Sequence, residues 1–288
     1  MSLLLAITLA GLPAGYEGHP HLVIHLPQGW LFLTPAGEQE FIVADVDGRE
    51  PISLAPVNGV GLVYTARRAT GQTGLFLKRG LQVSEDISVS DGFHGQVSVD
   101  SAGKTIAFSH HPGMGMSPEA DMAHGENAQL WVISLAHPDR PRKVTSSRGC
   151  KSEPAYSAGG ELFYNHSTCT GYQGLEVLDK ALRRTKELIP ASGYVAHPLV
   201  SPDGRHLLYY RKAGRGWAVL LSDYPGIVGQ RQVGELRAGE GLLSASWLSS
   251  GGRVLFASGA RLMRYDLAEG RSVEIPVAVP ALSDGGAL

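Results

Sequence analysis

The sequence predicts an all-β protein, a six-bladed β-propeller whose blades are four-stranded antiparallel sheets. Glycine and proline are frequent, at 37 and 17 of 288 residues, and they are spread along the whole chain. Such a distribution is typical of many short strands joined by tight turns. A hairpin-like unit also recurs along the chain, and six units of about 48 residues would account for its full length.

The repeated unit is clearest in VSPDGRHLLYYRK, residues 200–212, where a turn sequence is followed at once by an apolar, aromatic strand. Four other stretches have the same order of strand, glycine-containing turn and aromatic strand: residues 54–66, 97–111, 153–167 and 244–258. The aromatic residues are Tyr64, Phe108, Tyr164, Tyr209 and Phe256, separated by 44, 56, 45 and 47 residues. A period of about 40–50 residues is that of a propeller blade.

The two ends of the chain are expected to close the ring. Residues 21–26, 30–35 and 40–46 would be the second, third and fourth strands of one blade, and the C-terminal VPALSDGG (279–286) would supply its innermost strand. Such closure leaves no open sheet edge. Residues 16–288 are therefore expected to form a single propeller domain. Residues 1–15 are either a signal peptide, although they lack a positively charged start, or an extra strand.

The hairpin SPDGRHLLYY, with DSAGKTIAF as a looser copy, resembles the repeat of TolB-type propellers, which are relatives of the WD repeat. The resemblance covers roughly residues 50–270. It implies a six-bladed propeller that is commonly periplasmic. Propellers of this kind serve as protein-docking scaffolds, as domains of peptidases, and as lyases that hold a metal at one face.

Composition narrows the class of partner. The net charge of −2 and the pI near 6.6 give no basic field that would attract nucleic acid. No run is long enough for a membrane-spanning helix, and no G-x-S-x-G or H-E-x-x-H motif is present. We therefore expect a monomer that binds a protein, peptide or glycan partner at a propeller face.

The two cysteines, Cys150 and Cys169, flank the fourth hairpin. A two-residue turn at Gly159-Gly160 would place them opposite each other, so a disulfide is predicted. The alternative is a pair of neighbouring thiols. Since disulfides persist in oxidising compartments, the pair favours a periplasmic or secreted protein, while a cytoplasmic location stays open.

Most of the histidines map to the face where each innermost strand begins and the second strand ends. His110, His166 and Arg211 are equivalent in three consecutive blades, and Gln96, Glu153 and His197 form a second equivalent set. His94 and His111 map to the same face, as does His25 at the end of a second strand.

Imidazole and amide groups in a half-ring are ligands for Mn, Zn or Fe. The predicted metal ligands are His110, His166, His197 and Gln96; the catalytic candidates are Glu153, as a further ligand or base, and Arg211, which would bind a substrate carboxylate. The TolB-like oligogalacturonate lyases are similar in using several histidines and a glutamine for metal. The alternative is that a polar propeller mouth merely tolerates histidine.

The insertion at residues 110–127 holds Met114, Met116, Met122 and His124. Thioether and imidazole groups together suit copper, but an exposed methionine-rich loop is also an adaptable docking surface. A docking loop or a flap over the mouth is the preferred interpretation.

Two functions remain. The first is an extracytoplasmic binding or scaffold module that acts through its histidine-rich face. The alternative is a metal-dependent enzyme, similar to a polysaccharide lyase or hydrolase. The first ranks higher because no nucleophile motif is present and because the resemblance implies a scaffold.

Overall fold

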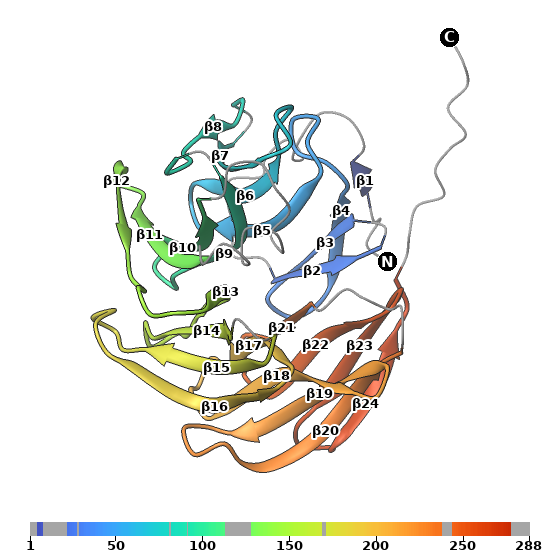
Figure 1. Ribbon diagram of the computed structural model, residues 1–288. Helices are drawn as coiled ribbons and strands as arrows, with labels where there is room; N and C mark the ends of the chain where they lie inside the picture. Colours follow the sequence, from blue (N-terminus) through green and yellow to red (C-terminus); the bar gives the residue numbers. More distant parts are fainter. Residues whose placement is uncertain are drawn as a thin grey trace.

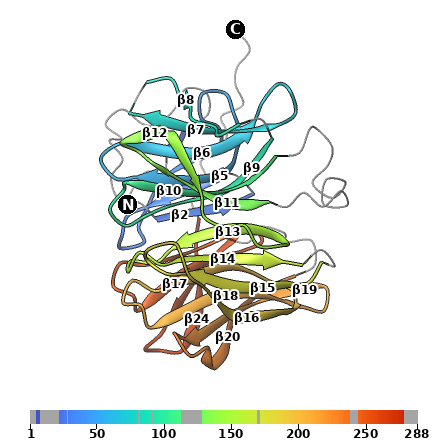
Figure 2. The same ribbon diagram turned by 60° about the vertical axis from the view of Figure 1, so that its left-hand side comes forward.

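The computed structural model of the protein describes residues 5–7, 22–27, 29–80, 82–90, 92–112, 128–168, 171–237 and 244–277. In these residues all regular structure is β-strand, and it forms six sheets of four strands each. Figures 1 and 2 show the sheets arranged as blades around a central axis. The six-bladed, four-stranded propeller predicted from the repeat is confirmed. Within the described residues no helix is present that could cross a membrane.

The blades follow one another along the chain. In each of blades 2 to 6 the first strand is the innermost and the fourth the outermost. Blade 2 holds β5 (Pro51–Val57), β6 (Gly61–Arg67), β7 (Thr73–Arg79) and β8 (Glu85–Asp86); blade 3 holds β9 (Phe93–Val99), β10 (Thr105–His111), β11 (Gln129–Ser134) and β12 (His137–Lys143). Blade 4 holds β13 (Cys150–Tyr156), β14 (Leu162–Ser167), β15 (Gln173–Leu178) and β16 (Thr185–Gly193). Blade 5 holds β17 (Val195–Val200), β18 (His206–Ala213), β19 (Gly216–Asp223) and β20 (Val228–Leu236); blade 6 holds β21 (Ala245–Trp247), β22 (Arg253–Ser258), β23 (Arg261–Asp266) and β24 (Arg271–Ile275).

The repeated turn explains why each hairpin forms where it does. In blade 5 the Ser201 amide donates to the His206 carbonyl and the Gly204 amide donates to the Ser201 carbonyl, both at 2.9 Å. Gly204 has a φ of 69°, in the left-handed region that glycine adopts without a steric penalty. The Ser201 hydroxyl accepts the His206 amide at 2.9 Å and donates to the Asp203 carboxylate at 2.5 Å. Serine, aspartate and glycine at these positions therefore specify the turn.

The recurring aromatic residues form the cores between blades. All five, from Tyr64 to Phe256, are fully buried. Tyr64, for example, stacks on Phe76 of its own blade and packs with Phe32 and Phe41 of blade 1. Burial of one such ring contributes roughly 1.5–3 kcal/mol, so the periodic aromatics are what holds neighbouring blades together.

Blade 1 departs from the pattern of the other five. It contains β2 (Leu22–Leu26), β3 (Gly29–Leu33) and β4 (Gln39–Val43), and β1 (Leu5–Ile7) pairs in parallel with β4 at the outer edge. The three strands predicted for residues 21–46 are thus confirmed, and residues 5–7 form an additional strand. Residues 278–288, from which the closing strand was predicted, lie outside the described residues.

The direction of β2 identifies its place in the blade. His25, near the end of β2, donates its amide to Ser244 at 2.8 Å, and Trp30, which pairs with His25, donates its indole N–H to Pro51 at 3.2 Å. Pro51 begins β5, and Ser244 immediately precedes β21. Because the end of β2 meets the starts of two innermost strands, β2 runs in the direction of a second strand, although no described strand lies between it and the axis.

The fourth hairpin has a different register from the predicted one. Ser157 donates its amide to the Glu161 carbonyl, so the turn is longer than Gly159-Gly160 alone. A bulge between Ser152 and Ala155 shifts the pairing further, and Cys150 faces Ser167. The predicted Cys150–Cys169 register is therefore wrong. Cys150 forms no disulfide with a described residue, and Cys169 lies outside the described residues, so the disulfide stays a prediction.

Candidate binding channel

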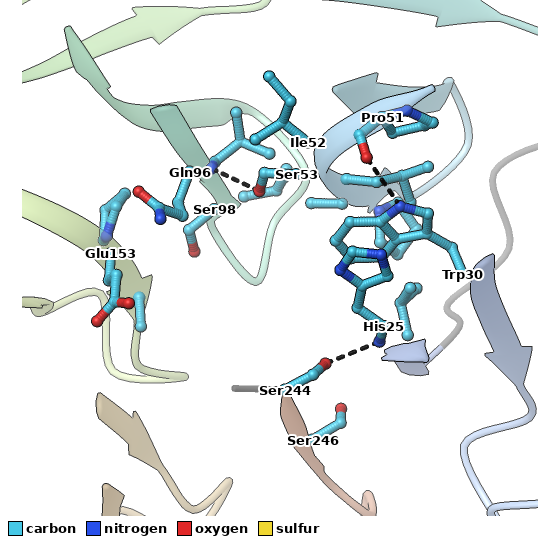
Figure 3. Close-up of a pocket in the computed structure, with 18 of the residues that line it drawn as sticks. His25, Trp30, Pro51, Ile52, Ser53, Gln96, Ser98, Glu153, Ser244 and Ser246 are labelled. Carbon is cyan, nitrogen blue, oxygen red and sulfur yellow. Dashed lines mark hydrogen bonds between the residues drawn. The ribbon is translucent and has the colours of Figure 1, made fainter. Parts of the chain in front are cut away.

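A cavity of about 1140 Å³ runs along the propeller axis, lined mainly by the innermost strands of the blades. Figure 3 shows side chains from several blades pointing toward it. One polar residue comes from each of blades 2 to 6, four positions before the residue that begins the hairpin turn. These five residues are Ser53, Gln96, Glu153, His197 and Ser244.

Three of these five residues and one further serine of the channel, Ser98, tie neighbouring blades together. The side chain of each accepts a hydrogen bond from a backbone N–H of the next blade. The four bonds run from Val97 N to Ser53 Oγ (3.0 Å), from Tyr156 N to Ser98 Oγ (3.1 Å), from His197 N to Glu153 Oε2 (2.6 Å) and from His25 N to Ser244 Oγ (2.8 Å). Part of the polar character of the channel therefore has a structural cause, because a backbone donor left unpaired would be costly.

Glu153 and His197 reach the channel through unusual backbone conformations. Their φ angles are 51° and 55°, in the left-handed region, and both lie in bulges of the innermost strand. A residue other than glycine that adopts this backbone conformation raises the free energy of the folded state by about 1–3 kcal/mol. Equivalent residues in adjacent blades thus hold a carboxylate and an imidazole at the channel against a local cost. Strain of this kind is concentrated at functional sites.

Three side chains of the channel keep groups that are not used by the fold. Gln96 is exposed to the channel, and neither its amide nor the ring nitrogens of His197 hydrogen-bond to any described residue. Glu153 Oε2 accepts from His197 N and, at 3.4 Å, from Asn165 Nδ2, whereas no described donor reaches Oε1. An amide, an imidazole and a carboxylate oxygen are thus available to a ligand.

The imidazoles of the channel are neutral near pH 7. Burial lowers the pKa of His197, although the nearby Glu153 carboxylate opposes the effect. Burial also lowers the pKa of His25, opposed by Glu50; the His25 ring stacks on Trp30 at 4.1 Å with an interplanar angle of 5°. The formal charges on the channel wall are the carboxylates of Glu50, Asp100 and Glu153 and the guanidinium groups of Arg49 and Arg67.

The histidines of blade 3 are buried instead of forming a surface. His94, His110 and His111 are 1%, 3% and 5% exposed. The His94 ring donates from Nδ1 to the Thr73 carbonyl at 2.8 Å and accepts the Val89 amide at Nε2 at 3.3 Å, so it is held as the neutral tautomer. Burial lowers its pKa to about 4. The predicted histidine-rich binding face is therefore not exposed in blade 3.

His110 lies deep beside His94. Its ring is 4.7 Å from the His94 ring, and its Nε2 lies 3.2 Å from the Ser90 hydroxyl. These contacts belong to the packing between blades 2 and 3 and not to the channel.

His166 and Arg211 are engaged with the outer strands of their blades. His166 Nδ1 lies 2.8 Å from Glu176 Oε1, and the other oxygen of Glu176 accepts from the Tyr164 hydroxyl at 2.6 Å. Arg211 donates to Gln230 at 3.1 Å and lies over the Tyr209 ring. Neither side chain is part of the channel wall.

The predicted metal ligands are thus divided. His197 and Gln96 line the channel with Glu153, while His110 and His166 each have partners elsewhere. Among the described residues no group of three or more His, Cys, Asp or Glu side chains is arranged to hold a metal ion. Met114, Met116, Met122 and His124 lie outside the described residues.

Sequence reasoning missed the serines of the channel and the stacked His25–Trp30 pair. The serines carried a usable signal, since Ser53 and Ser244 precede their turns by the same four positions as Glu153 and His197. The stacked pair carried no such signal, because it depends on the register of β2 with β3, which places His25 opposite Trp30.

No family model and no curated protein matches this chain. Solved structures similar to it include TolB from Acinetobacter baumannii, at 17% identity and a TM-score of 0.65. The alignment covers 90% of this chain and 63% of the TolB chain. A nidogen/laminin complex matches at 13% identity and TM-score 0.59, covering 88% of this chain and 91% of that chain. An oligogalacturonate lyase in complex with manganese matches at 13% identity and TM-score 0.56, covering 86% and 70%. These likenesses establish the fold alone, and at that level they confirm the resemblance to TolB-type propellers.

Proposed function

We propose that this protein is a binding module whose axial channel receives an extended segment of a protein partner. The observation that carries the proposal is the pair of strained residues, Glu153 and His197, which present a carboxylate and an imidazole at equivalent positions of adjacent blades. The fold uses one oxygen of Glu153 and leaves the remaining groups available.

The chemistry of the channel favours a peptide that carries a cationic side chain. The free Glu153 oxygen would accept from an ammonium or guanidinium group, and charge-assisted hydrogen bonds of this type are about twice as strong as neutral ones. Gln96 has both a donor and an acceptor, which suits a main-chain amide. The neutral His197 ring adds a further donor or acceptor without opposing the cation.

Two observations support binding as the first candidate. The Gln96 amide, the His197 ring and one Glu153 oxygen line the channel and can each hydrogen-bond to a peptide. One structure with a similar fold belongs to a complex of two proteins, nidogen and laminin. A metal-dependent enzyme is the second candidate, because another structure with a similar fold is an oligogalacturonate lyase in complex with manganese.

The proposal is tested by placing a photo-crosslinking amino acid at Ser246, which lines the channel. The probe is a lysate of the source cells, and the crosslinked peptides are identified by mass spectrometry. We expect one partner segment containing lysine or arginine, and an at least tenfold loss of its crosslinking in the Glu153→Gln/His197→Ala variant.

The matched control carries the same crosslinker at Val83, which is 82% exposed and follows β7 of blade 2. Equal capture from Val83 and Ser246, or capture that is unchanged in the double variant, would contradict binding in the channel. Capture of an acidic segment would contradict the proposed role of Glu153.

We also propose an extracytoplasmic location, on the resemblance to TolB-type propellers. Fractionation of cells that express a C-terminally tagged copy is expected to recover the protein outside the cytoplasm. Recovery with a cytoplasmic marker enzyme would contradict this location.

A further inference from the structure

The outer edges of blades 3 and 4 carry an excess of basic residues. Counted from the turn before each outermost strand to the end of that strand, residues 135–143 and 179–193 together hold seven lysines and arginines against three aspartates and glutamates. The corresponding segments of blades 2, 5 and 6, residues 80–86, 224–236 and 267–275, hold two against five. Because the whole chain has a net charge of −2, this positive charge is a local concentration on two neighbouring blades.

Protection of the sheet edges explains the presence of charge there but not its sign. Charged residues on an outermost strand prevent the free edge of the sheet from pairing with another chain. Carboxylates serve this purpose as well as cations, and the outermost strand of blade 2, β8, consists of Glu85 and Asp86. The positive sign shared by blades 3 and 4 therefore needs another explanation.

The turn between β15 and β16 brings its cations to the seam between blades 3 and 4. Leu182, in this turn, packs against the apolar cluster that joins the two blades, and so does Tyr156. Burial raises the pKa of the Tyr156 hydroxyl and Asp100 raises it further, whereas Arg142 of β12 opposes them, so the Arg142 guanidinium lies near the same seam. We call five exposed basic residues of this turn and of β12 the basic rim: Arg140, Arg142, Lys180, Arg183 and Arg184.

The fold makes little use of the positive charges of the basic rim. In blade 2, by contrast, the edge carboxylate of Asp86 pairs with Arg68 at 2.7 Å. Within the described part of the chain, the rim has one ion pair, between Arg140 and the adjacent Asp139 at 3.7 Å, and these side chains are 78% and 73% exposed. Such an exposed pair contributes little to stability. The charges of the rim are therefore available to a partner.

The turn that carries three of the five cations is held by its own hydrogen bonds. The Asp179 carboxylate accepts the Arg183 amide at 2.9 Å, and the Asp179 carbonyl accepts the Leu182 amide at 2.7 Å. The Asp179 amide in turn donates to the Arg184 carbonyl at 3.0 Å. A backbone that is already ordered loses less conformational entropy when it binds a partner.

We propose that the basic rim binds an acidic segment of a partner protein. Four of its five residues are arginines, and a guanidinium group binds a carboxylate through two parallel hydrogen bonds. Asp139, Asp179 and Glu187 alternate with the cations along the chain. The separate carboxylates of a protein segment can contact the arginines between these acids, whereas the continuous negative charge of a membrane surface or a nucleic-acid backbone would also meet the acids.

This surface is separate from the axial channel, because no residue of the basic rim lines the channel. The channel is proposed to receive a cationic segment, and the rim an acidic one. The rim proposal therefore does not rest on the proposed function, and each can fail without the other.

Binding is tested with a fluorescein-labelled peptide of glutamate residues, by fluorescence anisotropy with the full chain at low salt, where surface charges are less screened. We expect the affinity to fall at least tenfold in the Arg142→Glu/Arg183→Glu variant. The matched control is Arg231→Glu/Arg271→Glu, which changes the net charge equally on the outermost strands of blades 5 and 6. We expect the control to bind within twofold of the unaltered chain.

Two outcomes of this experiment overturn the proposal. The first is an equal loss of affinity in both double variants, because the net charge of the protein would then be responsible. The second is the absence of saturable binding of the peptide to the unaltered chain. The Arg142→Gln/Arg183→Gln variant removes the charges without reversing them, and affinity equal to that of the unaltered chain would likewise overturn the proposal.

A second comparison tests the class of partner. Duplex DNA and vesicles of phosphatidylglycerol replace the peptide, and we expect both to bind more weakly than the peptide does. Binding of either probe that is at least as tight, and that is lost in the Arg142→Glu/Arg183→Glu variant, would overturn the choice of an acidic protein segment. Crosslinking from Ser246 in the channel is expected to be unchanged in that variant, which keeps the two proposals distinguishable.

Discussion

His94 and His197 lie near the beginning of the innermost strand in blades 3 and 5, yet they have opposite roles in the structure. His94 is buried between blades 2 and 3, and both of its ring nitrogens are hydrogen-bonded to backbone groups. The His197 ring faces the channel and hydrogen-bonds to no described residue, although its backbone N–H is bonded to Glu153.

The difference comes from the local backbone. His94 precedes the bulge of its strand and continues the regular pairing, opposite His110. His197 lies within the equivalent bulge of blade 5 and has a left-handed φ, which turns its side chain toward the axis. The residue type alone therefore does not show whether a histidine is available to a ligand.

The largest expected effect separates the two residues by stability. His94→Ala removes a buried ring and leaves the Thr73 carbonyl and the Val89 amide without their partner, so we expect a loss of about 2–4 kcal/mol in the free energy of unfolding. His197→Ala is expected to cost less than about 1 kcal/mol, because no hydrogen bond of the ring is lost. Urea unfolding of both variants measures the difference, and equal losses would remove the distinction.

The burial of His94 should also make the stability of the protein depend on pH. Burial lowers the pKa of His94 from 6.5 to about 4, so the unfolded chain binds a proton that the folded chain does not. The stability from the neutral ring is complete above about pH 6.5 and is lost as the pH falls toward 4, by up to about 3 kcal/mol.

This coupling is measured by unfolding at a series of pH values between 7.5 and 4. The control is His94→Asn, whose amide can still donate to Thr73 but does not titrate. We expect a shallower loss of stability in the variant, and parallel curves would show that His94 is not the group responsible.

An intermediate effect is expected for the bond between blades 4 and 5. Glu153→Ala leaves the His197 amide without its acceptor and should cost about 1–3 kcal/mol, whereas Glu153→Gln keeps an acceptor and should cost less than about 1 kcal/mol. Thermal unfolding compares the two. If the glutamine variant were as unstable as the alanine variant, the charge of Glu153 and not its hydrogen bond would be what stabilises the fold.

The smallest expected effect is an increase in the free energy of unfolding. Asparagine tolerates the left-handed region better than histidine, so His197→Asn is expected to raise the free energy of unfolding by about 0.5 kcal/mol. The same variant should bind the channel partner more weakly. A loss of stability of similar size would mean that the contact between the His197 and Tyr210 rings outweighs the backbone cost.

Much of the fold could be predicted because its causes are local and repeated. Ser201, Asp203 and Gly204 specify one turn through their own side chains and φ angles, and Tyr209 marks the strand that follows. Four similar hairpins then fix the period, and the period fixes the number of blades.

Register was less predictable. The turn after Ser157 and the bulge at Glu153 each move the pairing in blade 4, and Cys150 therefore faces Ser167. A bulge adds a residue without changing the hydrophobic pattern, so the sequence gives no sign of it.

The sequence by itself determined the propeller, its blade count and the position of Gln96, Glu153 and His197 near the start of their strands, because turn chemistry and burial periodicity act over a few residues. Only the tertiary structure decided which polar groups of the channel are available to bind a ligand. A side chain can hydrogen-bond to a backbone group of a neighbouring blade, as Ser98 and His94 do, or face the open channel, as His197 does. Which of the two occurs depends on contacts between segments 20 to 60 residues apart. No local pattern records such contacts.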